Sequence, residues 1–166
     1  MAKPKKATGG RGTPATAAAA TAGITYTLHP YEPGAHPGSY GEAAADALGV
    51  PYERIFKTLL AEVDGGLTVA IVPVAATLDL KALAAAAGGK KAHLADARAA
   101  ERATGDVVGG ISPLGQRRRL PTIVDASASG FGTIFVSAGR RGLQIELAPA
   151  DLIRLTQARA AAIARR

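Results

Sequence analysis

The sequence contains no cysteine and no tryptophan, and aromatic residues make up only 4% of its 166 residues. Without cysteine, the chain has no disulfide framework, no thiolate ligand for zinc and no thiol nucleophile of its own. It also lacks any run of about 20 apolar residues, the length that a membrane-spanning helix needs. The basic first residues are not followed by the long apolar segment of a secretory signal. We therefore expect a cytoplasmic protein.

The residues that are present favour one domain and an anionic partner. Hydrophobic residues make up 48% of the chain, which is enough to bury a core, and the length fits one domain. Lys and Arg number 20 against 13 Asp and Glu, a formal charge of +7 that favours partners such as nucleic acid. Residues 1–13 are basic and have no apolar pattern, which predicts a disordered tail before a domain over 14–166. The tail either contacts phosphates or is only a solvated terminus.

Helix caps and apolar patterning predict an α+β fold. Helices are expected at 14–22, 40–48, 80–87, 97–104 and 149–166. Strands are expected at 24–29, 54–63, 67–74, 91–94, 107–108, 122–124, 133–136 and 143–147. Asp64-Gly65-Gly66 predicts a tight hairpin. Helices interspersed with hairpins indicate a compact single domain with a mixed, barrel-like β-sheet and flanking helices.

Most standard catalytic signatures are missing. The segment from Gly110 to Gly115 has one residue too many for a G-x-S-x-G nucleophile elbow. The stretch from Gly105 to Gly110 lacks the Lys-Ser/Thr pair of a phosphate-binding loop. His29, His36 and His93 do not have the spacing of metal ligands. We expect neither a metal nor another cofactor.

Three local features remain as candidates, each with an ordinary alternative. Lys57 interrupts an apolar strand on the face opposite Phe56 and Thr58, although a strand lysine is usually a solvated surface residue. Gly109-Gly110 either forms a plain tight turn or lets backbone N–H groups face an oxyanion. The three arginines at 117–119 either contact phosphates or form a basic surface loop.

These features belong to longer blocks that together resemble a known family. The blocks are Phe-Lys-Thr-Leu at 56–59, Thr-Gly-x-x-Val-Gly-Gly-Ile-Ser-Pro-Leu-Gly-Gln at 104–116, Arg-Leu-Pro-Thr at 119–122 and Val-Ser-x-Gly-x-Arg-Gly-Leu at 136–143. The chain resembles, over about residues 20–165, the YbaK-type Cys-tRNA(Pro) deacylases of the YbaK/ProX family of aminoacyl-tRNA editing domains. The Gly-Gly-Ile-Ser-Pro-Leu-Gly-Gln block at 109–116 is long and specific, and it favours a functional role for Lys57 and Gly109.

The resemblance implies a compact α+β fold, a function and a set of site residues. Family members remove wrongly attached amino acids from tRNA, and this branch resembles enzymes that clear cysteine from tRNA(Pro) in trans. The implied partners are aminoacylated tRNA and prolyl-tRNA synthetase. The implied catalytic residues are Lys57 and Gly109, and the implied substrate-binding residues are Tyr31, Tyr40, Thr58, Gly110, Ser112 and Ser137. Tyr40 stands where Phe is usual, and Gln144 where some members carry Asp, so Gln144 is not expected to be catalytic.

The same resemblance implies substrate-assisted cleavage, in which the thiolate of the bound cysteine attacks its own ester carbonyl. Lys57 would hold the terminal adenosine phosphate and the ester end, and the Gly109 N–H would stabilise the oxyanion. The alternatives are an Ala-tRNA(Pro) or broad-specificity deacylase that uses water, and a non-catalytic RNA-binding module that uses the tail and the 117–119 loop. Lys57 together with Gly109 favours an enzyme, since plain binding does not need the pair.

Overall fold

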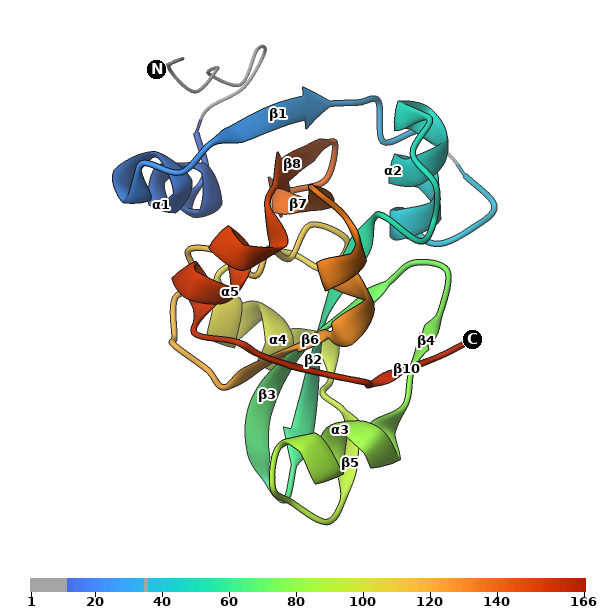
Figure 1. The fold of residues 1–166 in the computed structure, drawn as a ribbon, viewed down its shortest axis with the longest axis vertical. Coiled ribbons are helices and arrows are strands. Elements are labelled where there is room, and N and C mark those ends of the chain that lie inside the picture. Colours follow the sequence, from blue (N-terminus) through green and yellow to red (C-terminus); the bar gives the residue numbers. More distant parts are fainter. Residues whose placement is uncertain (1–11, 35) are drawn as a thin grey trace.

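The computed structural model describes residues 12–34 and 36–166 (Figure 1). Its helices are α1 (Pro14–Ala22), α2 (Tyr40–Leu48), α3 (Leu80–Ala86), α4 (Ala97–Thr104), the 3-10 helix η1 (Ala126–Gly130) and α5 (Pro149–Thr156). Its strands are β1 (Tyr26–Pro30), β2 (Phe56–Val63), β3 (Gly66–Pro73), β4 (Thr77–Leu78), β5 (Ala92–Leu94), β6 (Thr122–Asp125), β7 (Ile134–Arg140), β8 (Leu143–Leu147), β9 (Arg159–Ala161) and β10 (Ala164–Arg165). Residues 1–11 of the expected tail lie outside the described residues. No helix in the described ranges is long and apolar enough to span a bilayer.

Side-chain caps explain why four helices begin where the sequence predicts. Thr13, Ser39, Asp79 and Asp96 each accept a hydrogen bond from the backbone N–H three residues later. Each bond satisfies one of the N–H groups that the first helical turn leaves free. The cap at Ser39 also places Tyr40 at the first position of α2.

Two main sheets form the body of the domain and lie at its two ends (Figure 1). One is five-stranded, in the order β5-β2-β3-β6-β9, and the other is antiparallel, in the order β1-β8-β7. The larger sheet is mixed, because β2 pairs antiparallel with β3 while β3 with β6 and β6 with β9 are parallel. The α+β class with a mixed sheet is therefore confirmed. The described strands form separate sheets and no closed barrel, so the barrel-like detail is not confirmed.

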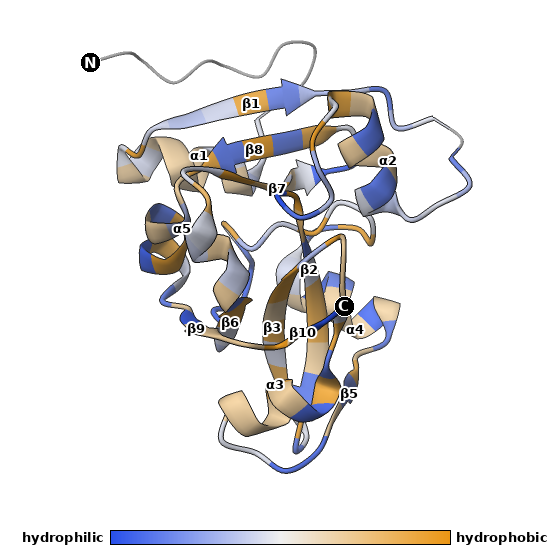
Figure 2. Ribbon diagram, turned by 45° about the vertical axis from the view of Figure 1, so that its right-hand side comes forward, coloured by the Kyte–Doolittle hydropathy of each residue, from blue (hydrophilic) through white to orange (hydrophobic). Residues whose placement is uncertain are grey.

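The larger sheet is buried on both faces, and its central strands β2 and β3 are strongly apolar (Figure 2). One face contributes Phe56, Leu60 and Ile71 to the main core, which also contains residues of α1, β7, β8 and α5. The other face packs Val72 and neighbouring residues against α3 and the C-terminal segment. A strand with two buried faces has room for few polar side chains. The polar residues Lys57 and Thr58 near the start of β2 are therefore exceptions to the apolar pattern of the strand.

The helix expected over 149–166 is wrong beyond residue 156. Gln157 has a positive φ of 56° and ends α5. The chain then runs extended across the domain, where β9 pairs with β6 and β10 pairs with β4 (Figure 1). Pairing with strands elsewhere in the sequence outweighs the helix propensity of this Ala-rich segment, because propensity is worth only tenths of a kcal/mol per residue.

Asp125 anchors this segment. Its Oδ1 accepts hydrogen bonds from the backbone N–H groups of Ile163 and Ala164, each at 3.0 Å, and its Oδ2 accepts from Ser127. Burial raises the pKa of Asp125, but these hydrogen bonds together hold it below its ordinary value. The carboxylate therefore stabilises the fold at neutral pH, and this contribution is lost as the pH falls through its lowered pKa.

We expect Asp125→Ala to lower the free energy of unfolding by about 1–3 kcal/mol at pH 7, because buried N–H groups lose their acceptor. Urea denaturation of the variant and the wild type measures the loss. The difference should shrink in acid, where the wild-type carboxyl is protonated. Glu53→Ala, at an exposed acid, is the control, and equal losses for the two variants would contradict the anchoring role.

Candidate functional site

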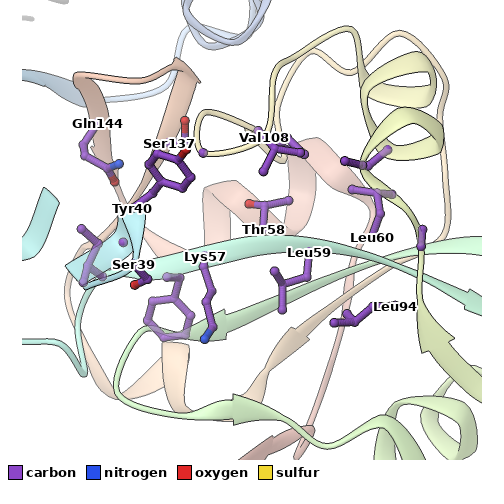
Figure 3. Close-up of a pocket in the computed structure, with 18 residues that line it drawn as sticks. Ser39, Tyr40, Lys57, Thr58, Leu59, Leu60, Leu94, Val108, Ser137 and Gln144 are labelled. Atoms are coloured by element: carbon purple, nitrogen blue, oxygen red, sulfur yellow. The ribbon is translucent and has the colours of Figure 1, made fainter. Parts of the chain in front are cut away.

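A cavity of about 340 Å³ lies beside β2, between the two sheets (Figure 3). Its walls come from the start of α2, the strand β2, the end of β5 with the first turn of α4, the turn before residue 111, and the strands β7 and β8. The lining residues are Ser39, Tyr40, Gly41, Ile55, Phe56, Lys57, Thr58, Leu59, Leu60, Leu94, Ala95, Ala97, Ala100, Val108, Gly109, Ile111, Ser137 and Gln144.

The cavity follows a free edge of β2. On this side, β2 pairs with β5 over Ala61–Val63 and meets β7 through one bridge, from Ile55 to Phe135. β3 pairs with the opposite edge of β2, but along this edge no strand of the described residues pairs with 56–60, where the carbonyl of Leu60 accepts from the N–H of Ala95 at 2.9 Å. Lys57 and Thr58 extend to opposite sides of β2 (Figure 3), as the alternation predicts. Both side chains nevertheless line the cavity, because the edge of β2 forms part of its wall and is reached from both sides of the strand.

Lys57 is the one charged side chain among the described residues that line the cavity. Burial lowers its pKa below the ordinary value, and the negative charge of Glu42 partly opposes this effect. The carboxylate of Glu42 is engaged at the cap of α2, where its Oε1 accepts from the N–H of Ser39. The ammonium group is thus partly desolvated and available to an anionic ligand.

On the other side of β2, polar atoms are buried without partners. Thr58 is 8% exposed and Gln144 only 6%, and neither Thr58 Oγ1 nor Gln144 Oε1 makes a hydrogen bond within the described part of the chain. Ser137 is also buried, and its Oγ accepts from the N–H of Gly139 at 3.2 Å. Buried polar groups are normally paired with protein or ordered water, so unpaired ones in a cavity wall are available to a bound ligand or to water.

Gln144 is a cavity residue that the sequence prediction left out. It is buried in β8, on the strand face opposite to that of the fully buried Leu143 and Ile145. The strand alternates apolar and polar residues, Leu-Gln-Ile-Glu-Leu, so periodicity predicts a solvated Gln144. The Asp that some members of the family that the chain resembles carry at this position was the available signal.

Residues 107–110 form a turn, so the strand expected at 107–108 is wrong. The N–H of Gly110 donates to the carbonyl oxygen of Val107 at 2.9 Å, and Gly109 has a φ of 92°. These are the features of a type II turn, which requires a positive φ at its third residue. Apolar residues at 107 and 108 indicated a strand, but the two glycines after them favour the turn.

Neither glycine has room for a side chain. A Cβ at Gly109 would lie 2.8 Å from Arg141 Nε and 2.9 Å from the Tyr40 ring, and a Cβ at Gly110 would lie 2.6 Å from the backbone of residues 140 and 141. Gly109 lines the cavity and Gly110 packs behind it. The turn is therefore pressed against Tyr40 and the β7–β8 turn.

Five of the eight predicted site residues line this cavity: Tyr40, Lys57, Thr58, Gly109 and Ser137. Tyr31, Gly110 and Ser112 do not. Tyr31 packs on the apolar cluster beneath α2. Ser112 is fully buried behind the turn, where its N–H donates to Asp106 Oδ2 at 3.0 Å and its Oγ accepts from Leu114. Burial raises the pKa of Asp106, and the Ser112 hydrogen bond partly opposes this.

The histidines lie outside the cavity and are paired with carboxylates. The Nε2 atoms of His29, His36 and His93 lie 2.9, 2.8 and 2.7 Å from carboxylate oxygens of Glu146, Asp46 and Glu62. The exposed arginines at 117–119 also lie outside the lining. Across residues 12–34 and 36–166, no cluster of three or more His, Asp or Glu has a geometry that would hold a metal ion.

Comparison with known proteins identifies the family. The profile of the family described as "Aminoacyl-tRNA editing domain" matches residues 36–155. The chain belongs to this family. Every residue that lines the cavity falls within the matched range, so the cavity is part of the editing domain itself.

Relatives support the assignment. The editing domain is 42% identical over 123 residues to the "Putative Cys-tRNA(Pro)/Cys-tRNA(Cys) deacylase EbsC" of Enterococcus faecalis, covering 74% of this chain and 75% of that protein. Among solved structures, the hypothetical protein APE2540 matches with a TM-score of 0.81 and 26% identity, over 92% of this chain and all (100%) of that one. A "putative trans-editing enzyme for prolyl tRNA synthetase" shares the fold, with a TM-score of 0.75 and 23% identity over 85% and 87% of the two chains.

The electrostatics of the editing-domain cavity give a prediction for Lys57. We expect its pKa to lie below the ordinary lysine value of 10.5 and to fall further in Glu42→Gln, because the attraction that favours the ammonium is removed. NMR titration of the Lys57 Cε resonance measures both values. Glu53→Gln serves as a control for the loss of a remote charge, and an unchanged or higher pKa in Glu42→Gln would contradict the assignment.

Proposed function

We propose that this editing domain deacylates Cys-tRNA(Pro) in trans and that the thiol of the substrate is the nucleophile. One observation carries the proposal: among the described residues, the cavity wall holds the hydroxyl groups of Ser39, Tyr40, Thr58 and Ser137 but no histidine or carboxylate to activate them. A hydroxyl group becomes an effective nucleophile when a base lies within hydrogen-bond reach, and no hydrogen bond of the described residues joins one of these hydroxyl groups to a basic side chain, Lys57 included. The chain also has no cysteine. The cysteine side chain of the substrate can supply what the cavity lacks.

In the proposed reaction, the thiolate sulfur of the cysteinyl group attacks its own ester carbonyl carbon. A carbon–sulfur bond forms, and the bond from the carbonyl carbon to the ribose oxygen breaks. The released ribose oxygen takes up a proton to restore the hydroxyl at the end of the tRNA, and the thiol has given up its own. The products are free tRNA and a cyclic thiolactone, which water later opens to cysteine.

The residues divide between the two sides of β2. On one side, the partly desolvated ammonium of Lys57 would hold the terminal adenosine phosphate and the ester end. On the other, Thr58, Ser137 and Gln144 offer uncharged hydrogen-bonding groups to the aminoacyl part. The N–H of Gly109 would meet the oxyanion. Positioning can supply ~7–11 kcal/mol of a barrier, and one oxyanion donor about 3 kcal/mol, so catalysis without a protein nucleophile is energetically reasonable.

The partner that presents the substrate would be the tRNA, with prolyl-tRNA synthetase as the proposed second partner. A formal charge of +7 favours association with an RNA backbone. The name of EbsC, at 42% identity, includes Cys-tRNA(Pro), which supports the choice of substrate. The fold shared with the "putative trans-editing enzyme for prolyl tRNA synthetase" supports action in trans.

A second candidate is a deacylase that uses water, acting on Ala-tRNA(Pro) or a broader set. The unpartnered oxygens of Thr58 and Gln144 favour it, because a water molecule held between polar groups needs at least two such partners. The two reactions differ in whether the sulfur of the substrate is required.

The deciding experiment compares Cys-tRNA(Pro) with Ser-tRNA(Pro) in single-turnover assays. Serine is nearly isosteric, but its hydroxyl is far less ionised than a thiol with a pKa of about 8.5. We expect the serine ester to react far more slowly, by more than the 10–200-fold, about 1–3 kcal/mol, that pocket discrimination alone provides. A thiolactone should be trapped before cysteine appears. Equal rates, with label from solvent water incorporated at the cleavage step, would favour the water-using deacylase.

Replacement of Lys57 tests its place in the site. We expect Lys57→Ala to abolish deacylation while the protein stays folded, because a lysine that faces the cavity serves the ligand and contributes little to the core. Lys57→Arg should also be poor, since a planar guanidinium cannot replace a compact ammonium in a narrow site. Rates on Cys-tRNA(Pro) and circular dichroism make the comparison, with Lys81→Ala at an exposed lysine as the control. Wild-type rates in Lys57→Ala would remove Lys57 from the mechanism.

A further inference from the structure

Arg141, in the turn between β7 and β8, joins two walls of the cavity from outside. It donates two hydrogen bonds to the carbonyl oxygen of Val108, from Nε at 2.9 Å and from Nη2 at 2.6 Å. Its guanidinium group also lies over the ring of Tyr40, with Cζ 4.5 Å from the ring centroid. Val108 and Tyr40 line the cavity, whereas Arg141 does not.

The carbonyl that Arg141 holds belongs to the central peptide of the 107–110 turn. Type I and type II turns differ by a rotation of this peptide of about 150–170°, which exchanges the sides of its C=O and N–H. Glycine at the third position tolerates φ of either sign. Gly109 therefore permits both orientations, and a contact from outside the turn has to select one.

The contact from Arg141 selects the orientation that is observed. In a planar trans peptide, the C=O of Val108 and the N–H of Gly109 point in opposite directions. A Val108 carbonyl directed at Arg141 therefore places the Gly109 N–H on the opposite side of the turn. Among the hydrogen bonds of the described residues, none uses this N–H. It remains available to a ligand in the cavity that Gly109 lines.

We propose that Arg141 is a positioning residue for deacylation: it holds the Val108–Gly109 peptide so that the Gly109 N–H faces the developing oxyanion. The inference rests on the proposed function. The same guanidinium stacks on the Tyr40 ring and keeps it against the turn. The ring packs so closely there that a Cβ at Gly109 would clash with it. Only a planar, forked group can stack on a ring and bind one oxygen through two nitrogens at once, so lysine cannot replace it.

The test uses two neighbouring arginines as a matched pair. Arg141→Ala and Arg140→Ala remove the same charge from adjacent positions at the end of β7, but the Arg140 side chain contacts the carbonyl of Arg141, at 3.4 Å, and not that of Val108. We expect the single-turnover rate on Cys-tRNA(Pro) at saturating enzyme to fall about 10–1,000-fold in Arg141→Ala, the range up to full loss of an oxyanion donor. KM should change little. Arg140→Ala should keep the wild-type rate, and Arg141→Lys should resemble Arg141→Ala.

Two further measurements separate positioning from a general structural role. In the free protein, the amide resonance of Gly109 in ¹H–¹⁵N spectra should shift or broaden in Arg141→Ala and not in Arg140→Ala. Added guanidinium ion should restore part of the rate to Arg141→Ala, because it can occupy the vacated site beside the Val108 carbonyl.

Three results would overturn the inference. Equal rates for the two alanine variants would do so. So would a slow Arg141→Ala whose Gly109 resonance is unmoved, or a defect confined to KM, since either would mean that Arg141 contacts RNA directly. A wild-type protein that cleaves no aminoacyl-tRNA would instead overturn the proposed function, and the two failures are thus distinguishable.

Discussion

The contact between the start of β2 and β7 is the constraint on which the cavity depends. The two main sheets meet there through the bridge between Ile55 and Phe135, and the N–H of Phe135 donates to the carbonyl of Arg54 at 3.1 Å. From this point, β2 carries Lys57 and Thr58 away from β7, and the gap between the strands becomes the cavity. If β7 met the chain beside β2 at another residue pair, Ser137 and Gln144 would no longer face the same cavity as Thr58.

Charged groups secure this contact without entering the cavity. The guanidinium of Arg54 donates to Glu146 at 3.1 Å and to the side chain and carbonyl of Thr133, and it lies 5.1 Å from the Phe135 ring centroid. Burial raises the pKa of Glu146, yet hydrogen bonds from Thr133 and His29 and the charge of Arg54 hold it below its ordinary value. The Glu146 carboxyl therefore stays ionised at neutral pH, and one of the three histidines is a partner in this structural network.

The cavity itself combines one cation with uncharged polar atoms, and this combination suits positioning better than covalent catalysis. Lys57 approaches from one side of the strand edge, and Thr58 and Gln144 approach from the other. Behind them, a tightly packed layer of Gly110, Ser112 and Asp106 holds the 107–110 turn in place. Rigid support of this kind is what a site needs when the substrate supplies the reactive group.

Local signals in the sequence determined the helix starts, the β2–β3 hairpin and the family, because caps, glycine turns and motif blocks act over a few residues. Lys57, Thr58, Gly109 and Ser137 were identified through those blocks. Only the tertiary structure decided the end of the last helix, where Asp125 captures the backbone at 163 and 164. It also decided that Gln144 lines the cavity while Tyr31 and Ser112 do not, and that Arg141 reaches Val108. These features depend on contacts between residues 30 or more positions apart in most cases, and periodicity and propensity carry no information about such contacts.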